Sequence, residues 1–209
     1  MENVSFKPRK ISNSPVLRNS TNDKGTPPYF FLKPPTSLVE EDSDIFQIPA
    51  LYKDVKQETT LGVIIGTKCK SVEVRRAMNY VMGYCVAQDL TGVDQLIEAR
   101  EKCQPWMLAK CFDTSCPVTR FIPYDALKDP QNAMLWCIVN GGPRQHANTK
   151  EMIHTIPELI SFISMFMTLE KFDLILTGSP PYSGLIYPGD VIEFGIDDLA
   201  SAVFSIDTE

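Results

Sequence analysis

The stretch VKQETTLGVIIG, residues 55–66, places a single carboxylate, Glu58, at the start of an apolar segment with the character of a β-strand. Such a position suits a ligand for a hard cation, since Mg²⁺ binds oxygen atoms. Asp89 holds a comparable place at the end of the apolar stretch 82–88. A solvated strand-edge charge explains Glu58 equally well, and a turn residue that ends a strand explains Asp89.

Lys110 lies in the apolar sequence WMLAKCF, where a surface charge is hard to explain. A buried lysine needs a partner, and Asp113, Glu58 or a bound anion would serve. The sequence LTGSP, residues 176–180, is by itself only a turn, because Gly and Pro at such spacing usually form one.

Histidine and cysteine chemistry is limited in this chain. His146 and His154 are the only histidines, so no histidine base comes from the first two-thirds of the sequence. The six cysteines are irregularly spaced, and no second cysteine pair or nearby histidine completes a zinc set with Cys111 and Cys116. Free thiols in a reducing compartment are therefore expected.

The hydrophobic pattern predicts the elements that must position these groups. Strands are predicted at residues 29–34, 61–66 and 82–90 and in the sequences LWCIVN, LILTG, DVIEFGI and SAVFSI. Helices are predicted from Ser71, as the cap, to Tyr80 and over residues 93–102. Strands and helices do not alternate strictly, which indicates an α+β domain built on a rolled or sandwiched β core.

The clearest helix follows Thr155. Thr155 and Glu158 have the spacing of a capping box, and Pro157 lies in the first turn. One face of this helix is apolar and is expected to pack in the core: Leu159, Phe162, Ile163, Phe166 and Met167.

Composition excludes several classes of partner. The formal net charge is −6 and no Lys/Arg cluster is present, which argues against nucleic-acid binding. The longest apolar stretch, residues 159–167, is too short to cross a membrane, so no membrane association is expected. We expect residues 1–28, rich in Pro, Ser, Asn, Thr and Lys, to form an irregular arm, and residues 29–209 to form one domain.

We expect no secretory signal from the residue types at the start of the sequence. Lys7, Arg9, Lys10 and Arg18 among several serines resemble a mitochondrial transit peptide, although Glu2 and the scattered prolines weaken that similarity. A mitochondrial or cytoplasmic location is expected, and secretion is not.

The order and spacing of several long motifs resemble the fumarylacetoacetate hydrolase family. The motifs are FFLKP, LGVIIG, AMNYVMGYCVAQDLTGVD, PWMLAKCFDTSCPVTRFIP, LWCIVNG, RQ, MIHTIPELISFIS, LILTGSP and GDVIEFGI. Within the family they are most similar to the mitochondrial acylpyruvate hydrolase and oxaloacetate decarboxylase subgroup. The resemblance spans residues 29–207 and implies a mixed β-roll, a homodimer, and Mg²⁺ or Mn²⁺ held by three carboxylates for cleavage or decarboxylation of small oxo-acids or dicarboxylates.

Carried over residue by residue, the resemblance retains part of such a site. Glu58 and Asp89 match two of the three metal ligands, and Thr60 stands where the family has the third, a glutamate. Lys110 matches the family's lysine, which adds positive charge where an enolate forms. The substrate-binding turn is retained as Thr177, Gly178 and Ser179.

Other functional positions of the family have changed. Val93 replaces a substrate-binding arginine, Leu96 replaces a glutamine, and the sequence VSFKPRKIS lacks the histidine of the family's lid. Two hypotheses follow. The chain is either a divergent, metal-dependent acylpyruvate hydrolase, oxaloacetate decarboxylase or tautomerase with weakened metal binding, or a catalytically inactive paralogue that serves as a homodimeric binding or structural protein.

Overall fold

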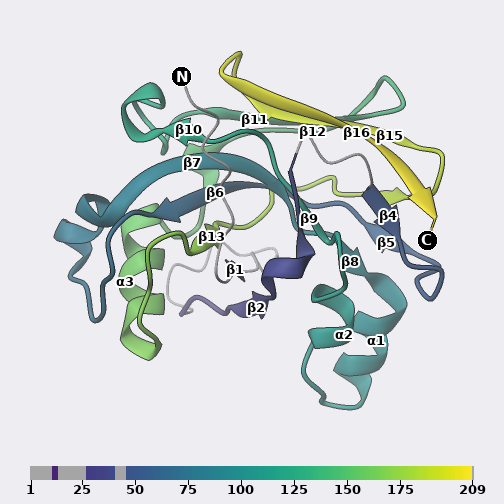
Figure 1. Cartoon of the computed structure of the whole chain (residues 1–209), viewed down its shortest axis with the longest axis horizontal. Coiled ribbons are helices and arrows are strands. Elements are labelled where there is room, and N and C mark those ends of the chain that lie inside the picture. The colour runs from purple at the N-terminus through teal and green to yellow at the C-terminus, as the bar shows by residue number, and fades with distance from the viewer. Residues whose placement is uncertain (1–10, 14–26, 41–45, 209) are drawn as a thin grey trace.

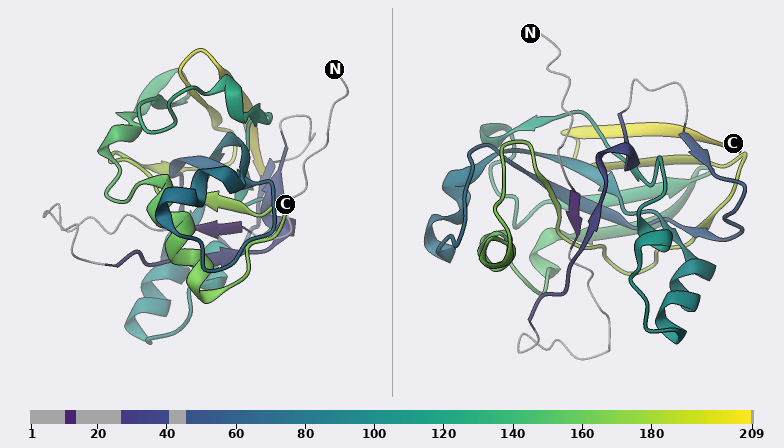
Figure 2. Two further views of the ribbon diagram at one scale, coloured as in Figure 1. Left: turned by 90° about the vertical axis from the view of Figure 1, so that its left-hand side faces the viewer. Right: turned by 60° about the horizontal axis from the view of Figure 1, so that its bottom comes forward.

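The structure is a computed structural model that describes residues 11–13, 27–40 and 46–208. Two β-sheets lie one over the other (Figure 1). Helix α3 (Ile156–Phe166) lies at one end of the molecule. The pair α1 (Val93–Glu101) and α2 (Met107–Lys110) projects from the other end, as Figure 2 also shows.

The strands of the core belong to two larger sheets, with smaller sheets beside them. One sheet has the order β10 (Ile122–Pro123), β7 (Val81–Gln88), β6 (Thr59–Ile65), β13 (Leu174–Leu176), β1 (Ile11–Asn13) and β2 (Phe31–Lys33). The other has the order β12 (Gly142–Asn148), β11 (Met134–Val139), β15 (Val191–Ile196), β16 (Ala200–Thr208) and β4 (Phe46–Ile48). Small sheets are formed by β14 (Leu185–Ile186), β5 (Val55–Lys56) and β8 (Thr91–Gly92), and by β3 (Leu38–Val39) and β9 (Cys116–Pro117). Short 3₁₀ helices are η1 (Pro35–Ser37), η2 (Val74–Tyr80), η3 (Tyr124–Ala126) and η4 (Thr149–Glu151).

Burial explains why the strands form where the pattern predicts them. Every residue of β6 is buried, as expected for an apolar strand covered on both faces. In β11 buried and half-buried residues alternate, because one face packs on the core and the other does not. The predicted α+β class, a β-roll with few helices, is confirmed.

A hairpin joins β11 to β12, and its turn lies between the paired residues Val139 and Gly142. Asn140 and Gly141 occupy the two turn positions with φ values of 52° and 74°. An Asn-Gly pair with positive φ at both positions is favoured in two-residue hairpins, because its twist matches that of the strands.

Helix α3 begins with the predicted capping box. Thr155 Oγ1 accepts from the N–H of Glu158, and Glu158 Oε2 accepts from the N–H of Thr155. Leu159 and Ile163 are buried as expected. Phe166 is 63% exposed, so its predicted place in the core is wrong.

The predicted helix from Ser71 is wrong in its start and its type. A 3₁₀ helix, η2, begins only at Val74, and Ser71 has a φ of 51°. Hydrogen bonds to α3 hold the preceding residues out of a helix: Ser164 Oγ accepts from the N–H of Val72, and Ser161 Oγ donates to the carbonyl of Val72.

The N-terminal segment is described only in part. Residues 1–10 and 14–26 lie outside the described residues, so the arm stays a prediction there. Within it, Ile11–Asn13 form β1, which pairs parallel to β13 and antiparallel to β2. All six cysteines are free thiols, as expected. In the part of the chain that the structure describes, no helix has the length and apolar character to span a membrane.

Candidate active site

Glu58 and Asp89 become neighbours through the pairing of β6 with β7. Thr59, the first residue of β6, lies opposite Gln88, the last residue of β7. The N–H of Asp89 donates to the carbonyl of Glu58 over 2.8 Å, which extends this antiparallel ladder. Two carboxylates that are distant in sequence therefore project from one end of the sheet.

The ammonium group of Lys110, at the end of α2, lies between these carboxylates. Its Nζ atom is 2.5 Å from Asp89 Oδ2 and 3.0 Å from Glu58 Oε2, and it also donates to Thr91 Oγ1. An ammonium has three N–H donors, so these oxygens satisfy all of them. The ring of Phe31 covers the group, with its centroid 4.7 Å from Nζ. The predicted burial of Lys110 is confirmed.

Charge pairing outweighs burial at this centre. Burial disfavours the charged form of Lys110, but Asp89 and Glu58 outweigh it and raise the pKa of the amine. Burial likewise disfavours ionised Glu58, whose side chain is 24% exposed. The ammonium groups of Lys110 and Lys56 and a hydrogen bond from Thr91 outweigh that effect and hold the pKa of Glu58 below its usual value. Both groups are therefore charged at neutral pH.

Asp113, one of the predicted partners of Lys110, is not part of this centre. Its side chain is exposed, and the contacts of Lys110 go to Asp89, Glu58 and Thr91. Sequence proximity favoured Asp113, but the fold brings the more distant carboxylates to the amine.

Sequence reasoning missed Lys33, a second buried lysine beside Asp89. Its Nζ atom lies 3.3 Å from Asp89 Oδ1 and 3.2 Å from the carbonyl of Leu90. It also donates to Ser115 Oγ, at 2.9 Å, and to the carbonyl of Lys110. The signal was available, because Lys33 interrupts the apolar strand sequence YFFLKP as Lys110 interrupts WMLAKCF.

Lys33 is best described as an ammonium. Burial lowers the pKa of this amine and Asp89 opposes the effect. Three hydrogen-bond acceptors surround its Nζ atom, and only the charged form has three donors for them. The two carboxylates of Glu58 and Asp89 thus face the two ammonium groups of Lys33 and Lys110, and the buried centre has no net charge.

We expect Lys33→Met to lower the free energy of unfolding by about 3 kcal/mol, because it removes one of the two ammonium groups that balance Glu58 and Asp89 and takes its donor from the carbonyl of Leu90. Lys56→Met is the matched control. Lys56 lies 3.5 Å from Glu58 but is 38% exposed, so its loss should cost less than about 1 kcal/mol. Urea denaturation of the two variants measures the difference, and equal losses would contradict the assignment of Lys33 to the buried centre.

Thr60 lies beside the centre without joining it. Alternation along β6 puts its side chain on the same face as Glu58. Thr60 is fully buried, and its hydroxyl donates to the carbonyl of Leu61 at 3.4 Å. Across residues 11–13, 27–40 and 46–208, no group of three or more His, Cys, Asp or Glu side chains is arranged to hold a metal ion.

Thr177, Gly178 and Ser179, for which the family resemblance predicted substrate binding, lie next to this strand. Thr177 is buried, and both its N–H and its hydroxyl donate to the carbonyl of Leu61, at 3.0 and 2.9 Å. Gly178 has a φ of 102°, which favours glycine, and the hydroxyl of Ser179 accepts from Nε2 of Gln145. These contacts place the turn beside Thr60. The side-chain hydrogen bonds of Lys110 go to Glu58, Asp89 and Thr91 and not to the turn.

The fold and the buried centre define a class, an α+β protein of the β-roll type with lysines and carboxylates paired at the ends of two core strands. The chain belongs to the fumarylacetoacetate hydrolase family: the profile of the fumarylacetoacetate (FAA) hydrolase C-terminal family matches residues 9–206.

Individual relatives are similar along most of their length. The chain is 44% identical to a mitochondrial oxaloacetate decarboxylase of Dictyostelium discoideum over 85% of this chain and 82% of that protein. It is 42% identical to the human mitochondrial oxaloacetate tautomerase FAHD1 over 86% of this chain and 81% of that protein. The crystal structure of a Pseudomonas aeruginosa fumarylpyruvate hydrolase in complex with Mn²⁺ and pyruvate superposes with a TM-score of 0.89 at 26% identity, covering 98% of this chain and 91% of that one.

The donor set of the centre fits a divalent cation only together with a second ligand. Asp89 Oδ1 is buried and forms an ion pair with Lys33 at 3.3 Å but receives no hydrogen bond, and Glu58 Oε1 lies 3.5 Å from Lys56, so one oxygen of each carboxylate has room for a further ligand. Mg²⁺ is commonly held by one or two protein carboxylates with water and substrate oxygens. Because the centre is already neutral, a divalent ion alone would bring two uncompensated positive charges into it.

Proposed function

We propose that this protein decarboxylates or tautomerises a small oxo-dicarboxylic acid of the oxaloacetate type, with Mg²⁺ or Mn²⁺ bound jointly with that acid. The observation that carries the proposal is the buried Lys110 ammonium held between Glu58 and Asp89. The oxaloacetate activity of the similar decarboxylase and tautomerase supports the choice of substrate.

The residues of the centre have distinct roles in this reaction. Glu58 and Asp89 would hold the metal ion, which polarises the carbonyl group of the bound oxo-acid. Lys110 supplies fixed positive charge where the enolate oxygen develops, in a water-poor setting where such charge is most effective. Thr91 keeps the amine in place by accepting one of its hydrogen bonds. Thr177, Gly178 and Ser179 would bind the carboxylate of the substrate.

Decarboxylation and tautomerisation suit these residues better than hydrolysis. In decarboxylation, the bond to the departing carboxylate breaks, carbon dioxide leaves, and the electron pair forms an enolate that takes up a proton from solvent. Tautomerisation only moves a proton between carbon and oxygen, so neither reaction needs water activated as a nucleophile. Hydrolysis of an acylpyruvate needs a general base for water, and loss of such a base typically costs on the order of 10² to 10⁴ in rate. The family's lid histidine has no counterpart in the sequence.

Calorimetric titration with Mn²⁺ and Mg²⁺, with and without oxalate as an enolate mimic, tests this proposal. We expect weak binding of the metal alone, with a Kd above about 1 mM, and micromolar binding in the presence of oxalate. The dianion compensates the charge of the metal, so each ligand should strengthen binding of the other by the same factor.

Asp89→Asn is the control for the same titration, and it should abolish the coupled binding because it removes a ligand charge. If the wild-type protein binds neither the metal ion nor oxalate when both are present at several millimolar, the proposed activity is wrong. If coupled binding is present, oxaloacetate turnover should follow its metal dependence.

A specific observation favours a second candidate, a non-catalytic protein of the same fold. All three N–H donors of Lys110 are already used within the chain, so its ammonium is engaged before any substrate arrives. Relative to the family, Thr60 and Val93 remove two charges, one from the metal site and one from the substrate site, and Leu96 removes a polar contact. A folded protein without coupled binding would support this candidate.

We also propose that the chain forms a homodimer and acts in mitochondria. The resemblance to the family supports the dimer, and the mitochondrial names of the similar decarboxylase and tautomerase support the location. Light scattering coupled to size-exclusion chromatography should give twice the monomer mass.

A further inference from the structure

The side chain of Gln145, on β12, joins two segments that lie far apart in the sequence. It is 2% exposed, whereas its neighbours Arg144 and His146 are exposed. Its Oε1 atom accepts a hydrogen bond of 2.9 Å from the backbone N–H of Thr59, the residue that follows Glu58. One end of this amide is therefore attached to the strand that begins at the active centre.

The other end of the amide contacts the turn after β13. Nε2 of Gln145 lies 3.0 Å from Ser179 Oγ, 2.8 Å from the carbonyl oxygen of Pro180 and 3.2 Å from that of Pro181. An amide nitrogen only donates and an amide oxygen only accepts. A reversed amide would set its oxygen against three oxygens, so the surroundings determine which end faces the turn.

Gln145 holds the middle of the turn, whereas other contacts hold its two ends. At its start, Thr177 is held by the carbonyl of Leu61. At its far end, the carbonyl of Gly184 accepts from the N–H of Gln57 at 2.9 Å. The two consecutive prolines between these points have no N–H to donate. Among the described residues, the amide of Gln145 makes the hydrogen bonds that join the middle of the turn to β6.

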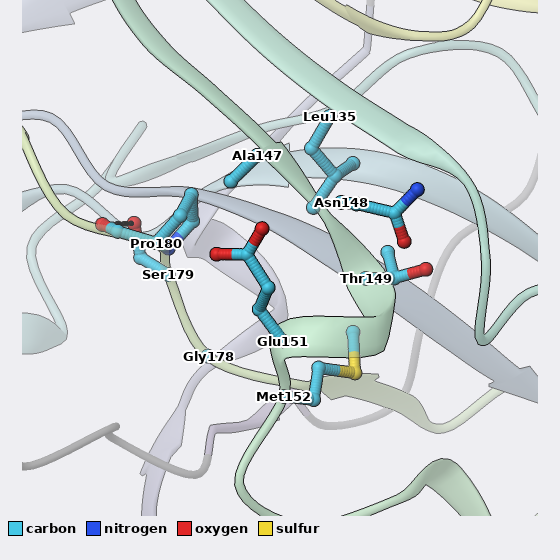
Figure 3. Close-up of a pocket in the computed structure, with 9 residues that line it drawn as sticks. All are labelled: Leu135, Ala147, Asn148, Thr149, Glu151, Met152, Gly178, Ser179 and Pro180. Atoms are coloured by element: carbon cyan, nitrogen blue, oxygen red, sulfur yellow. Dashed lines mark hydrogen bonds between the residues drawn. The ribbon is translucent and has the colours of Figure 1, made fainter.

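A pocket borders the same turn, as Figure 3 shows. Gly178, Ser179 and Pro180 form one wall, and Glu151 and Met152 belong to the other. The carboxylate of Glu151 points toward the segment that carries Ser179 and Pro180. The turn therefore borders a small cavity on this side, so side-chain packing there is incomplete.

We propose that Gln145 is a positioning residue that holds the Thr177–Pro181 segment against β6, beside Glu58, and thereby sets the affinity for the oxo-acid anion. This inference rests on the proposed function, since it takes the turn to bind the substrate carboxylate. Gln145 touches neither Lys110 nor the carboxylates of the centre, so its effect is on the placement of the turn.

The test compares three variants of the full chain. Gln145→Met has a side chain of similar length but makes none of the hydrogen bonds of the amide. Gln145→Glu keeps an acceptor for the N–H of Thr59 but loses the donor that faces the turn. His146→Gln, at the exposed neighbouring position, is the matched control. The readouts are hydrogen exchange by mass spectrometry and calorimetric titration of oxalate in the presence of Mn²⁺.

We expect both Gln145 variants to exchange about tenfold faster in residues 177–187, with unchanged exchange in the core strands β11 and β15. Oxalate affinity should fall about 10- to 100-fold, because loss of a hydrogen bond to a charged group has an effect of this size. His146→Gln should behave as the wild type. A merely structural role would instead raise exchange throughout the sheets.

Two outcomes would overturn the inference: unchanged exchange in the turn of Gln145→Met, or oxalate affinity equal to that of the wild type in both Gln145 variants. Absence of oxalate binding in the wild type is a different result, which overturns the proposed function itself. The two failures are therefore distinguishable.

Discussion

Thr60→Glu should increase the affinity for Mn²⁺ and Mg²⁺ by about 30-fold or more. Alternation along β6 directs residue 60 to the same face as Glu58, so the new carboxylate joins Glu58 and Asp89. The attraction between a unit charge and a divalent ion about 4 Å apart is about 2 kcal/mol even in bulk water, which corresponds to about 30-fold. Calorimetric titration of metal without oxalate measures the gain directly.

The matched control for this prediction is Thr60→Gln, which has the shape of the glutamate without its charge. It should leave metal affinity unchanged, while thermal unfolding shows that either larger side chain is accepted at this buried position. A folded Thr60→Glu protein with the metal affinity of the wild type would show that the face of β6 shared with Glu58 is not a cation site.

Lys110→Met should lower the free energy of unfolding by about 5 kcal/mol, the largest stability effect expected in this chain. The substitution leaves Glu58 and Asp89 without the ammonium that both of them contact. Removal of one partner from a buried pair is costly because the remaining charge is left uncompensated. Urea denaturation at neutral pH measures the loss.

A double-mutant cycle separates charge pairing from packing in this result. Adding Asp89→Asn to Lys110→Met should recover part of the stability, since it removes the excess negative charge and leaves Glu58 balanced by Lys33. Additive losses would contradict a direct interaction between the two residues.

The pH dependence of stability tests independently whether Glu58 and Lys110 stabilise the folded protein as charged groups. The pKa of Glu58 is lowered in the folded protein, so its contribution is present above the unfolded value of about 4.3 and is lost as the pH falls through the folded value. The pKa of Lys110 is raised, so its contribution is present below its unfolded value of about 10.4. The stability difference between wild type and Lys110→Met should therefore be greatest between these limits and shrink in acid.

The sequence by itself determined the elements whose signals are local. The apolar run of β6, the alternation in β11 and the capping box of α3 each depend on residues close together in the chain, and the structure confirms them. The burial of Lys110 was also predictable, because its apolar neighbours cannot all be exposed.

Where local signals competed with long-range contacts, the sequence was a poor guide. Ser71 has the residue type of a helix cap, but hydrogen bonds from α3 to Val72 fix the backbone there in another form. Phe166 continues the apolar stripe of α3, yet it is the last residue of the helix and is 63% exposed, whereas Leu159 and Ile163 are buried.

Only the tertiary structure decided which charges meet. Lys110 pairs with Glu58 and Asp89, rather than with nearby Asp113, because antiparallel pairing brings the start of β6 to the end of β7. Lys33 reaches the same centre from β2, at the far edge of the sheet order, and neutralises it. Residue types along a chain give the charges, but their balance depends on distances that arise only when distant strands pack together.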